Sequence, residues 1–463
     1  MERPNAWKRY GETDLAELEK LCCDYRAFIS DNKTERECVV ASVKLAEAAG
    51  YVNLEQVATE GRKLSAGDKV YAVCHNKTVM LANLGCAPIE QGVNILGAHI
   101  DSPRLDIKQN PLYEAGDMAY LDTHYYGGVK AYHWVATPLA LHGVVCKKDG
   151  TTVEVVVGED AADPVFCVSD LLIHLASDQM KKPASEAVDH ENLDIIVGGR
   201  PVVIEGDEDA KEPVKQMLLD ILKDKYGIDE EDLLSAELEV VPAGAARDLG
   251  LDRSMILGYG QDDRSCAYTS LVAQLDAEAP ARTAVCLLVD KEEIGSVGAT
   301  GMTSRFFENT MAEVLELAGE TGPLALRRCL AASNMLSSDV SAGFDPTFAS
   351  VFEPKNSAYL GHGLTFNKYT GSRGKSGSND ADAEYVATIR RVMDEGGVHF
   401  QTAELGKVDA GGGGTIAYIL ATYGMNVIDC GVPVLSMHAP WEATSKADIY
   451  EAYRGYQEFL KLA

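Results

Sequence analysis

An uninterrupted apolar run followed by a cluster of acids constrains this chain more than any other feature. The run, residues 284–289, shows no alternation of polar and apolar side chains, which predicts a strand buried on both faces, as in a parallel sheet. Asp290, Glu292 and Glu293 follow at once, and Gly295 lets the chain turn. Because ligands of open α/β sheets bind outside the carboxyl ends of the strands, this cluster is a candidate site of chemistry. Adjacent glutamates of an extended chain point to opposite sides, so one could bind a metal while the other faces a water molecule.

Four more predicted strand ends carry side chains suited to the same chemistry. They are His99 and Asp101 after residues 93–98, Asp262 after 255–260, Asp339 after Ser337 and Ser338, and His438 at the end of the run 432–438 that continues the strand 426–431. Taken singly, an Asp in such a place is often a helix cap and a His is often structural. Together, two imidazoles and several carboxylates from distant parts of one α/β unit suit a pair of divalent metal ions.

The chemistry of paired metals assigns a role to each ligand. Two metals about 3.5–4 Å apart need a bridging carboxylate and at least one further anionic ligand each. Asp262 can bridge the two ions. His99 with Asp339 can complete one ion, and Glu293 with His438 can complete the other.

Two acidic residues remain for other tasks. Asp101 lies two residues from His99, on the same side of an extended segment, where it can accept the second imidazole N–H and fix the tautomer. Glu292 is left to take a proton from a water molecule at the metals, as a general base.

The composition excludes several classes of function. Over 463 residues the formal net charge is −29, which disfavours nucleic acid and anionic membrane surfaces as partners. No apolar run approaches the roughly 20 residues that span a bilayer, and we expect no signal peptide. The eleven cysteines are scattered without a Cys-x-x-Cys pair, which predicts a reducing, cytoplasmic location and no cysteine zinc site.

The distribution of predicted strands and helices along the chain indicates an inserted domain. Residues 1–60 look helical, and alternating strands and helices return after residue 250. Between them, short strand-like segments at 131–134, 139–145, 152–157, 195–196, 202–204 and 238–241 accompany one helix near 214–225. We therefore predict a discontinuous catalytic α/β domain, 1–104 and 249–463, with a mixed sheet flanked by helices. An inserted β-rich domain would cover 105–248.

The motifs resemble those of a known family, the M18 metallopeptidases or aspartyl aminopeptidases. The likeness rests on His99-Ile-Asp-Ser-Pro, the Asp pair after Gln261, Asp290-Lys-Glu-Glu-Ile-Gly-Ser, Ser338-Asp339 and Ser436-Met-His-Ala-Pro-Trp-Glu442, and it extends essentially end to end. It implies a zinc-peptidase fold whose inserted domain makes dimer contacts, and a homo-oligomer, typically a dodecamer built from dimers. The family's binuclear zinc ligands carry over to His99, Asp262, Glu293, Asp339 and His438, with Glu292 as general base.

Two departures from the family pattern point to a bacterial-type branch. Members of the family close to the animal enzymes carry an Asp-Arg pair after a Trp in the inserted domain, and the corresponding positions here are Ala136 and Thr137. A Lys expected to meet an acidic substrate side chain aligns with Thr365, and only Lys368, Arg373 and Lys375 lie nearby, in a glycine- and serine-rich loop. We therefore favour a pocket for a neutral N-terminal residue over an acidic one. His174 is either a contributor to a neighbouring subunit's site, as in the family, or a structural residue beside leucines at helical spacing.

The leading function is that of a cytoplasmic aminopeptidase that removes one N-terminal residue from a peptide with a free N-terminus. The cofactors would be two divalent ions per subunit, with Zn²⁺ favoured and Co²⁺ or Mn²⁺ as alternatives. A deacylase or amidohydrolase with the same binuclear site is the enzymatic alternative. A non-catalytic self-assembling scaffold is the other, and it predicts erosion of Glu292 or its neighbouring ligands, all of which are intact.

Overall fold

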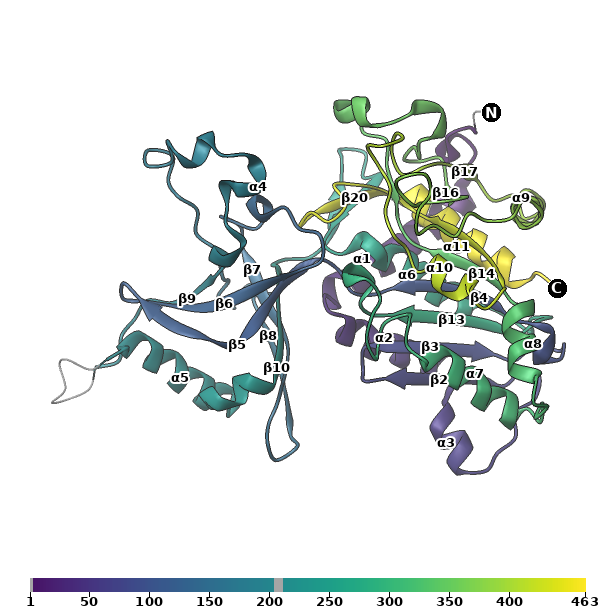
Figure 1. The fold of residues 1–463 in the computed structure, drawn as a ribbon, viewed down its shortest axis with the longest axis horizontal. Helices are drawn as coiled ribbons and strands as arrows, with labels where there is room; N and C mark the ends of the chain where they lie inside the picture. Colours follow the sequence, from purple (N-terminus) through teal and green to yellow (C-terminus); the bar gives the residue numbers. More distant parts are fainter. Residues whose placement is uncertain (1–2, 204–210) are drawn as a thin grey trace. The chain divides into compact units, whose positions relative to one another are not determined.

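The computed structural model describes residues 3–203 and 211–463. The chain divides into two compact units, which are described separately (Figure 1). The first unit consists of Met1–Asp101, Ala246–Met437 and Glu442–Ala463. The second consists of Ser102–Ala245 and the short segment His438–Trp441. No helix among the described residues combines the length and the apolar character that crossing a membrane requires.

A nine-stranded mixed sheet forms the centre of the first unit. Its order is β1 (Val52–Asn53), β2 (Lys69–Cys74), β3 (Thr78–Asn83), β13 (Ala284–Val289), β4 (Asn94–His99), β14 (Asn334–Ser338), β18 (Asn426–Gly431), β16 (Leu364–Asn367) and β17 (Phe400–Thr402). The four central strands, β13, β4, β14 and β18, are parallel, so their carboxyl ends meet at one edge of the sheet.

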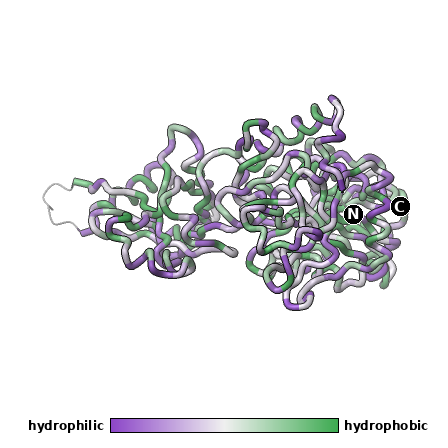
Figure 2. Tube along the Cα trace, turned by 90° about the horizontal axis from the view of Figure 1, so that it is seen from above, coloured by the Kyte–Doolittle hydropathy of each residue, from purple (hydrophilic) through white to green (hydrophobic). Residues whose placement is uncertain are grey.

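Helices cover both faces of this sheet. One core joins the sheet to α1 (Glu12–Asp31), α2 (Glu35–Ala48), α6 (Gln261–Leu275), α9 (Ala383–Glu395) and α11 (Lys446–Leu460). The other joins it to α3 (Leu54–Thr59), α7 (Phe306–Leu317), α8 (Ala325–Ala332) and α10 (Ala417–Ala421). Alternate residues of β13 enter the two cores, which confirms the predicted strand buried on both faces. Figure 2 shows the alternation of hydrophobic and hydrophilic stretches along the trace.

A smaller five-stranded sheet completes the first unit. It runs in the order β11 (Arg247–Leu249), β12 (Met255–Gly258), β20 (Glu442–Ser445), β19 (Pro433–Leu435) and β15 (Ser341–Ala342). Strand β12 leads through Gly260 into α6, and so this sheet fixes the start of the helix that carries Asp262. The predicted α/β fold, a mixed sheet flanked by helices, is confirmed.

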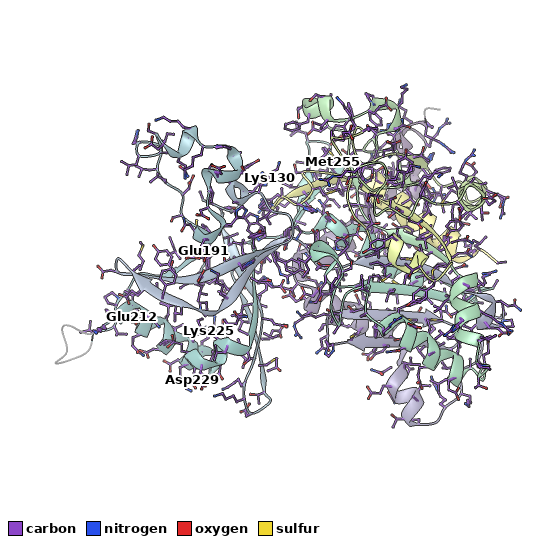
Figure 3. The ribbon with its side chains drawn as sticks, viewed as in Figure 1. Lys130, Glu191, Glu212, Lys225, Asp229 and Met255 are labelled. Carbon is purple, nitrogen blue, oxygen red and sulfur yellow. The ribbon has the colours of Figure 1, made fainter. Side chains whose placement is uncertain are left out.

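The second unit is built on a six-stranded antiparallel sheet. Its order is β8 (Thr152–Val157), β7 (Leu139–Cys146), β10 (Ala236–Pro242), β5 (Arg104–Ala115), β6 (Met118–Tyr126) and β9 (Ile195–Gly198), and the unit also contains α4 (Ala184–Ala187) and α5 (Pro213–Tyr226). Figure 3 labels Glu212 and Lys225 near the two ends of α5. Strands β5 and β6 join through Gly116 and Asp117, whose φ angles of 60° and 59° suit a tight hairpin turn.

The structure corrects the sequence reading in three places. The long hairpin β5–β6 was absent from the predicted strands. Residues 131–134, predicted as a strand, begin instead with the 3₁₀ helix Ala131–His133. Of the strand predicted at 202–204, Val202 and Val203 have no regular structure and Ile204 lies outside the described residues. The predicted helix near 214–225 is confirmed by α5.

Candidate metal centre

His99, the last residue of β4, is the centre of a buried acidic cluster. Its Nδ1 lies 3.0 Å from the carbonyl oxygen of Asp101 and 3.3 Å from Asp101 Oδ1. Its Nε2 points the other way, 3.3 Å from Asp262 Oδ1, 3.9 Å from Asp339 Oδ1 and 4.0 Å from Glu292 Oε2. The ring is therefore held from one side, and its second nitrogen faces three carboxylates.

The Asp101 carboxylate also orders the chain that follows β13. It accepts the backbone N–H of Glu292 through Oδ1 at 3.1 Å and that of Glu293 through Oδ2 at 3.2 Å. Asp101 thus fixes both the imidazole of His99 and the backbone of the two glutamates. The contact between Asp101 and His99 expected from their spacing is present.

The two glutamates adopt a different backbone from the one predicted. They begin the 3₁₀ helix Glu292–Ile294, between Lys291 and Gly295, whose φ angles are 69° and 96°. The extended conformation predicted for them is therefore wrong. Successive residues of a 3₁₀ helix are about 120° apart around its axis, so the two side chains still diverge.

Asp262 is positioned by the turn between β12 and α6. Gly260 is in the left-handed region at φ 70°, and the Asp262–Asp263 peptide bond is cis. The Asp262 N–H donates to Glu442 Oε2 at 3.0 Å, and the side chain of Gln261 donates to the carbonyl oxygen of Glu442 at 2.6 Å. Strand β20 therefore anchors the start of α6.

Two residues at the site received no role from the sequence. Asp263 is fully buried, and its Oδ2 accepts the backbone N–H of His99 at 3.4 Å. Glu442 is 1% exposed and holds the backbone of Asp262. Both belong to motifs that the sequence singles out, but their contacts depend on tertiary structure, and no spacing rule could have identified them.

The donor groups of the first unit fit divalent metal ions. One set of possible ligand atoms, from His99, Glu292 and Glu293, lies within 4.8 Å of one another. A second set, from His99, Asp262 and Asp339, meets the same limit. Imidazole nitrogen and carboxylate oxygen are donors that zinc and related ions accept. Because Glu292 belongs to the first set, its position suits either a metal ligand or a base beside the metal.

The electrostatics of the cluster also favour bound cations. Burial raises the pKa of Asp339 well above its usual value, and the neighbouring Asp263 and Glu292 add to the rise while His99 opposes it. Burial disfavours the charged imidazole of His99, but hydrogen bonds with Asp101 and Asp262 outweigh this effect and raise its pKa well above the usual value. Carboxylates so close together stay ionised only when positive charge is shared among them.

The remaining predicted ligand lies in the second unit. His438 follows β19 by three residues, has a φ of 65°, and its Nδ1 is 3.0 Å from the carbonyl oxygen of Gly128. Its part in the metal centre stays a prediction. In the first unit, the N–H of Asp339 donates to the carbonyl oxygen of Cys430 at 2.7 Å and so fixes that ligand to β18.

The residues noted for specificity and assembly lie away from any regular helix. His174 is exposed in a series of turns, so the structural reading of it at helical spacing is wrong. Ala136 has a φ of 55°, and its N–H donates to the carbonyl oxygen of Val168. Thr365 is buried inside β16, and its hydroxyl has no hydrogen-bond partner among the described residues.

An α/β sheet with acidic and imidazole side chains gathered where its parallel strands end is the arrangement of a metallohydrolase. The model of the aminopeptidase I zinc metalloprotease family (M18) matches residues 28–460. A probable M18 family aminopeptidase 1 of Clostridium acetobutylicum is 58% identical over 99% of this chain and 98% of its own. The probable M18 family aminopeptidase 1 of Thermotoga maritima is 43% identical over 100% of this chain and 99% of its own.

Solved structures agree with these relatives. The crystal structure of the Thermotoga maritima M18 aminopeptidase has a TM-score of 0.94 at 44% identity and covers 100% of both chains. That of aminopeptidase I from Clostridium acetobutylicum has a TM-score of 0.91 at 56% identity and covers 99% of both. The S. cerevisiae mApe1 dodecamer shares the fold, with a TM-score of 0.77 at 21% identity over 96% of this chain and 97% of its own. This chain belongs to the M18 family of zinc metallopeptidases and is a metallo-aminopeptidase.

Proposed function

We propose that the protein removes single N-terminal residues from peptides at a centre of two divalent metal ions. The ligands are His99, Asp262, Glu293, Asp339 and His438, and zinc is the favoured metal. The arrangement around His99 supports this proposal: Asp101 holds one ring nitrogen, and the other faces carboxylates from three separate segments. Imidazole oriented by a carboxylate in this way is the usual arrangement in zinc enzymes.

Each residue has a defined task in the proposed reaction. Two bound ions would lower the pKa of a water molecule and polarise the scissile carbonyl group. Glu292 takes a proton from the attacking water and passes it to the leaving amine, which restores the carboxylate. Asp101 keeps Glu292 in place through the backbone N–H at 3.1 Å and keeps His99 in the tautomer whose Nε2 can bind a metal.

A pair of substrates separates this function from that of a deacylase with the same metals. An aminopeptidase cleaves leucine anilide with a free α-amine and leaves the N-acetylated compound intact. A deacylase removes the acetyl group and releases no aniline from the free compound. Release of aniline from leucine anilide alone is the result we expect, and removal of acetyl groups alone would refute the proposal. The scaffold alternative predicts neither reaction.

We also propose that the second unit is the inserted dimerisation domain, predicted at 105–248, and that the protein forms a dodecamer from dimers. Exposed apolar side chains in that unit support an interface: Ile173, Leu175 and Met180 are 67%, 68% and 70% exposed. Apolar side chains clustered in this way on a surface are typical of protein–protein contacts. The dodecamer of the yeast relative is consistent with this assembly. The cytoplasmic location stays a prediction.

A further inference from the structure

A surface pocket of about 300 Å³ lies beside the N-terminal segment of the first unit. Arg3 and Arg9 of that segment line it together with His362, His399 and Asp394. Phe400, at the start of β17, forms an apolar wall. All of these residues belong to the first unit, and none of them is among the candidate metal ligands.

The charge of this pocket is opposite to that of the chain. The whole protein has 71 acidic and 42 basic side chains, so acids outnumber bases. In the pocket, two arginines and two histidines accompany a single aspartate, Asp394. A basic hollow on a strongly acidic protein marks a place where a small anion gains most from binding.

Several polar groups of the pocket have no partner among the residues that the structure describes. Among residues 3–203 and 211–463, the guanidinium of Arg9 makes no ion pair or side-chain hydrogen bond. The ring nitrogens of His399 likewise make no hydrogen bond to a described residue, although the ring packs edge-on against Tyr10 at 6.2 Å. Among the described residues, His362 makes a single hydrogen bond, from Nδ1 to the carbonyl oxygen of Arg3 at 2.9 Å. The guanidinium of Arg9 and one ring N–H of His399 are available to donate to a ligand, and the Nε2 of a neutral His362 is available to accept.

Arg3 is held in the pocket before any ligand arrives. Its guanidinium carbon stacks on the ring of Phe400 at 3.8 Å, and one nitrogen contacts Asp394 Oδ1 at 3.1 Å. The segment that carries it is pinned by the hydrogen bond from the N–H of Ala6 to the carbonyl oxygen of Gly361, at 2.7 Å. A guanidinium offers five N–H donors in a planar fork that matches a carboxylate or phosphate. One contact with Asp394 leaves most of them free.

We infer that this pocket binds a compact dianion of the phosphate type, recognised by Arg3 and Arg9 with the two imidazoles at its sides. A volume near 300 Å³ is at the small end of ligand sites, so it suits a phosphate group or a small phosphate ester. It does not suit a nucleic acid, which the net charge of −29 repels. Two charge-assisted guanidinium contacts are the main source of affinity.

Substitution of Asp394 should strengthen anion binding, whereas substitution of a binding residue weakens it. Its carboxylate is 54% exposed and competes with the anion for Arg3. An exposed ion pair of this kind contributes little to stability, so a dianion can displace it. Asp394→Asn removes both the competitor and its repulsion, and it should tighten anion binding. If Asp394 only held the N-terminal segment against α9, its substitution would not increase the affinity for the anion.

The experiment is calorimetric titration of the metal-loaded full chain with sodium phosphate, at an ionic strength held constant with sodium chloride. We expect saturable binding that weakens about tenfold or more in Arg9→Ala, because a charge-assisted contact is lost. Lys8→Ala is the matched control, since Lys8 is an exposed base on the same segment that does not line the pocket. Its affinity should equal that of the wild type.

Three results would overturn the inference. The first is no saturable binding of phosphate by the wild type. The second is equal affinity in the wild type and Arg9→Ala, which would place the anion elsewhere, for example at the metals. The third is equal weakening in Arg9→Ala and Lys8→Ala, which would mean that only overall charge matters. Tighter binding in Asp394→Asn supports the site, and weaker binding there would contradict the role of Arg3.

Discussion

Asp101 connects the two halves of the candidate metal centre. One carboxylate reaches the ring of His99 at the end of β4 and the backbone of Glu292 and Glu293 after β13. Because the residue is fully buried, its charge acts on these partners with little screening by solvent. The orientation of a metal ligand and that of the proposed base therefore depend on the same side chain.

Substitutions at the two adjacent glutamates should separate base from ligand. Glu292→Gln keeps the size of the side chain but cannot accept a proton, so kcat should fall by about 10²–10⁴ while metal content stays normal. Glu293→Gln should instead lower metal content. Activity and bound metal, measured on the same preparations, test both statements. Equal loss of metal in the two variants would mean that Glu292 is a ligand, as its place near His99 and Glu293 also permits.

The candidate ligands of the site could be predicted from the sequence, but the residues that hold them in position could not. His99, Asp262 and Asp339 lie at strand or helix ends, and Asp262 and Asp339 face His99. For His99 and Asp339 the reason is that parallel strands end at one edge of the large sheet, whereas Asp262 follows β12, which is antiparallel to its neighbours in the smaller sheet. Asp263 and Glu442 were missed as supporting residues, since their partners are backbone N–H groups that only the folded chain brings near.

Among the elements, two short strands rich in β-branched and apolar residues were easier to predict than a long strand of mixed composition. The predicted strands at 284–289 and 152–157 are β13 and β8. Strand β5 escaped because Arg104–Ala115 contains charged residues and a proline, and its burial alternates irregularly across a register shift. A strand of that composition is stabilised by its partners β6 and β10, which a local pattern does not contain.

The loop between β16 and α9 should not favour acidic substrates. Asp380 holds Lys368 Nζ at 2.6 Å and Lys375 Nζ at 3.0 Å, and Thr365 brings no charge. Because an acidic side chain must be desolvated without a fixed cation, we expect kcat/KM for leucine and alanine anilides to exceed that for aspartate and glutamate anilides. Asp380→Asn releases both ammonium groups and should raise the value for aspartate severalfold. A tenfold or greater preference of the wild type for aspartate would contradict this prediction, and Arg373→Ala would then identify the cation.

Strand β18 contains a carboxylate that should make stability depend on pH. Asp429 accepts the hydroxyl of Thr415 at 2.5 Å, and burial raises its pKa from 3.8 to about 7. The folded state therefore binds this proton more tightly than the unfolded state, so the contribution of Asp429 to stability is greatest below pH 4 and is lost as the pH rises towards 7. The total cost is on the order of 4 kcal/mol.

Asp429→Asn removes that titration and keeps an acceptor for Thr415. The difference in unfolding free energy between this variant and the wild type should grow in the variant's favour from pH 4 to pH 7 and then level off. Urea unfolding at a series of pH values measures it. Asp117→Asn, in the exposed turn between β5 and β6, is the control and should follow the wild type. Parallel curves for Asp429→Asn and the wild type would show that Asp429 does not titrate in this range.

At the scale of the whole molecule, the metals should stabilise the fold. The proposed ligands come from segments between residues 99 and 438, and only the folded chain brings them together. Each site would add about 2.7 kcal/mol when free metal is a hundred times its Kd. We expect exhaustive chelation to abolish activity and lower Tm, and readdition of zinc to restore both. Full activity of the metal-free protein would refute the binuclear proposal. Because Glu293→Gln should bind less metal from the start, chelation should lower its Tm less than it lowers that of the wild type.

Assembly is the second property of the whole molecule. If the second unit carries the dimer contacts, sedimentation at micromolar concentration should give a species far larger than 49.9 kDa. Ile173→Asp places a charge among the exposed apolar side chains of residues 171–175 and should shift the distribution to smaller species. Glu154→Lys, at an exposed position of β8, is a control for charge alone. A wild-type monomer would contradict the assembly.

The order of the strands also determines how long β4 remains without its partner strands while the chain is being synthesised. Strand β4 pairs with β13 and β14, and about 180 residues of chain separate it from the nearer of these two partners. At about 5–20 residues per second, a ribosome needs roughly 10–40 s to make that chain. The second unit is almost continuous in sequence and can fold during this delay. Strand β4, apolar and unpaired along both edges, must meanwhile be kept from aggregation, so the insertion lengthens the most vulnerable stage in the life of the enzyme.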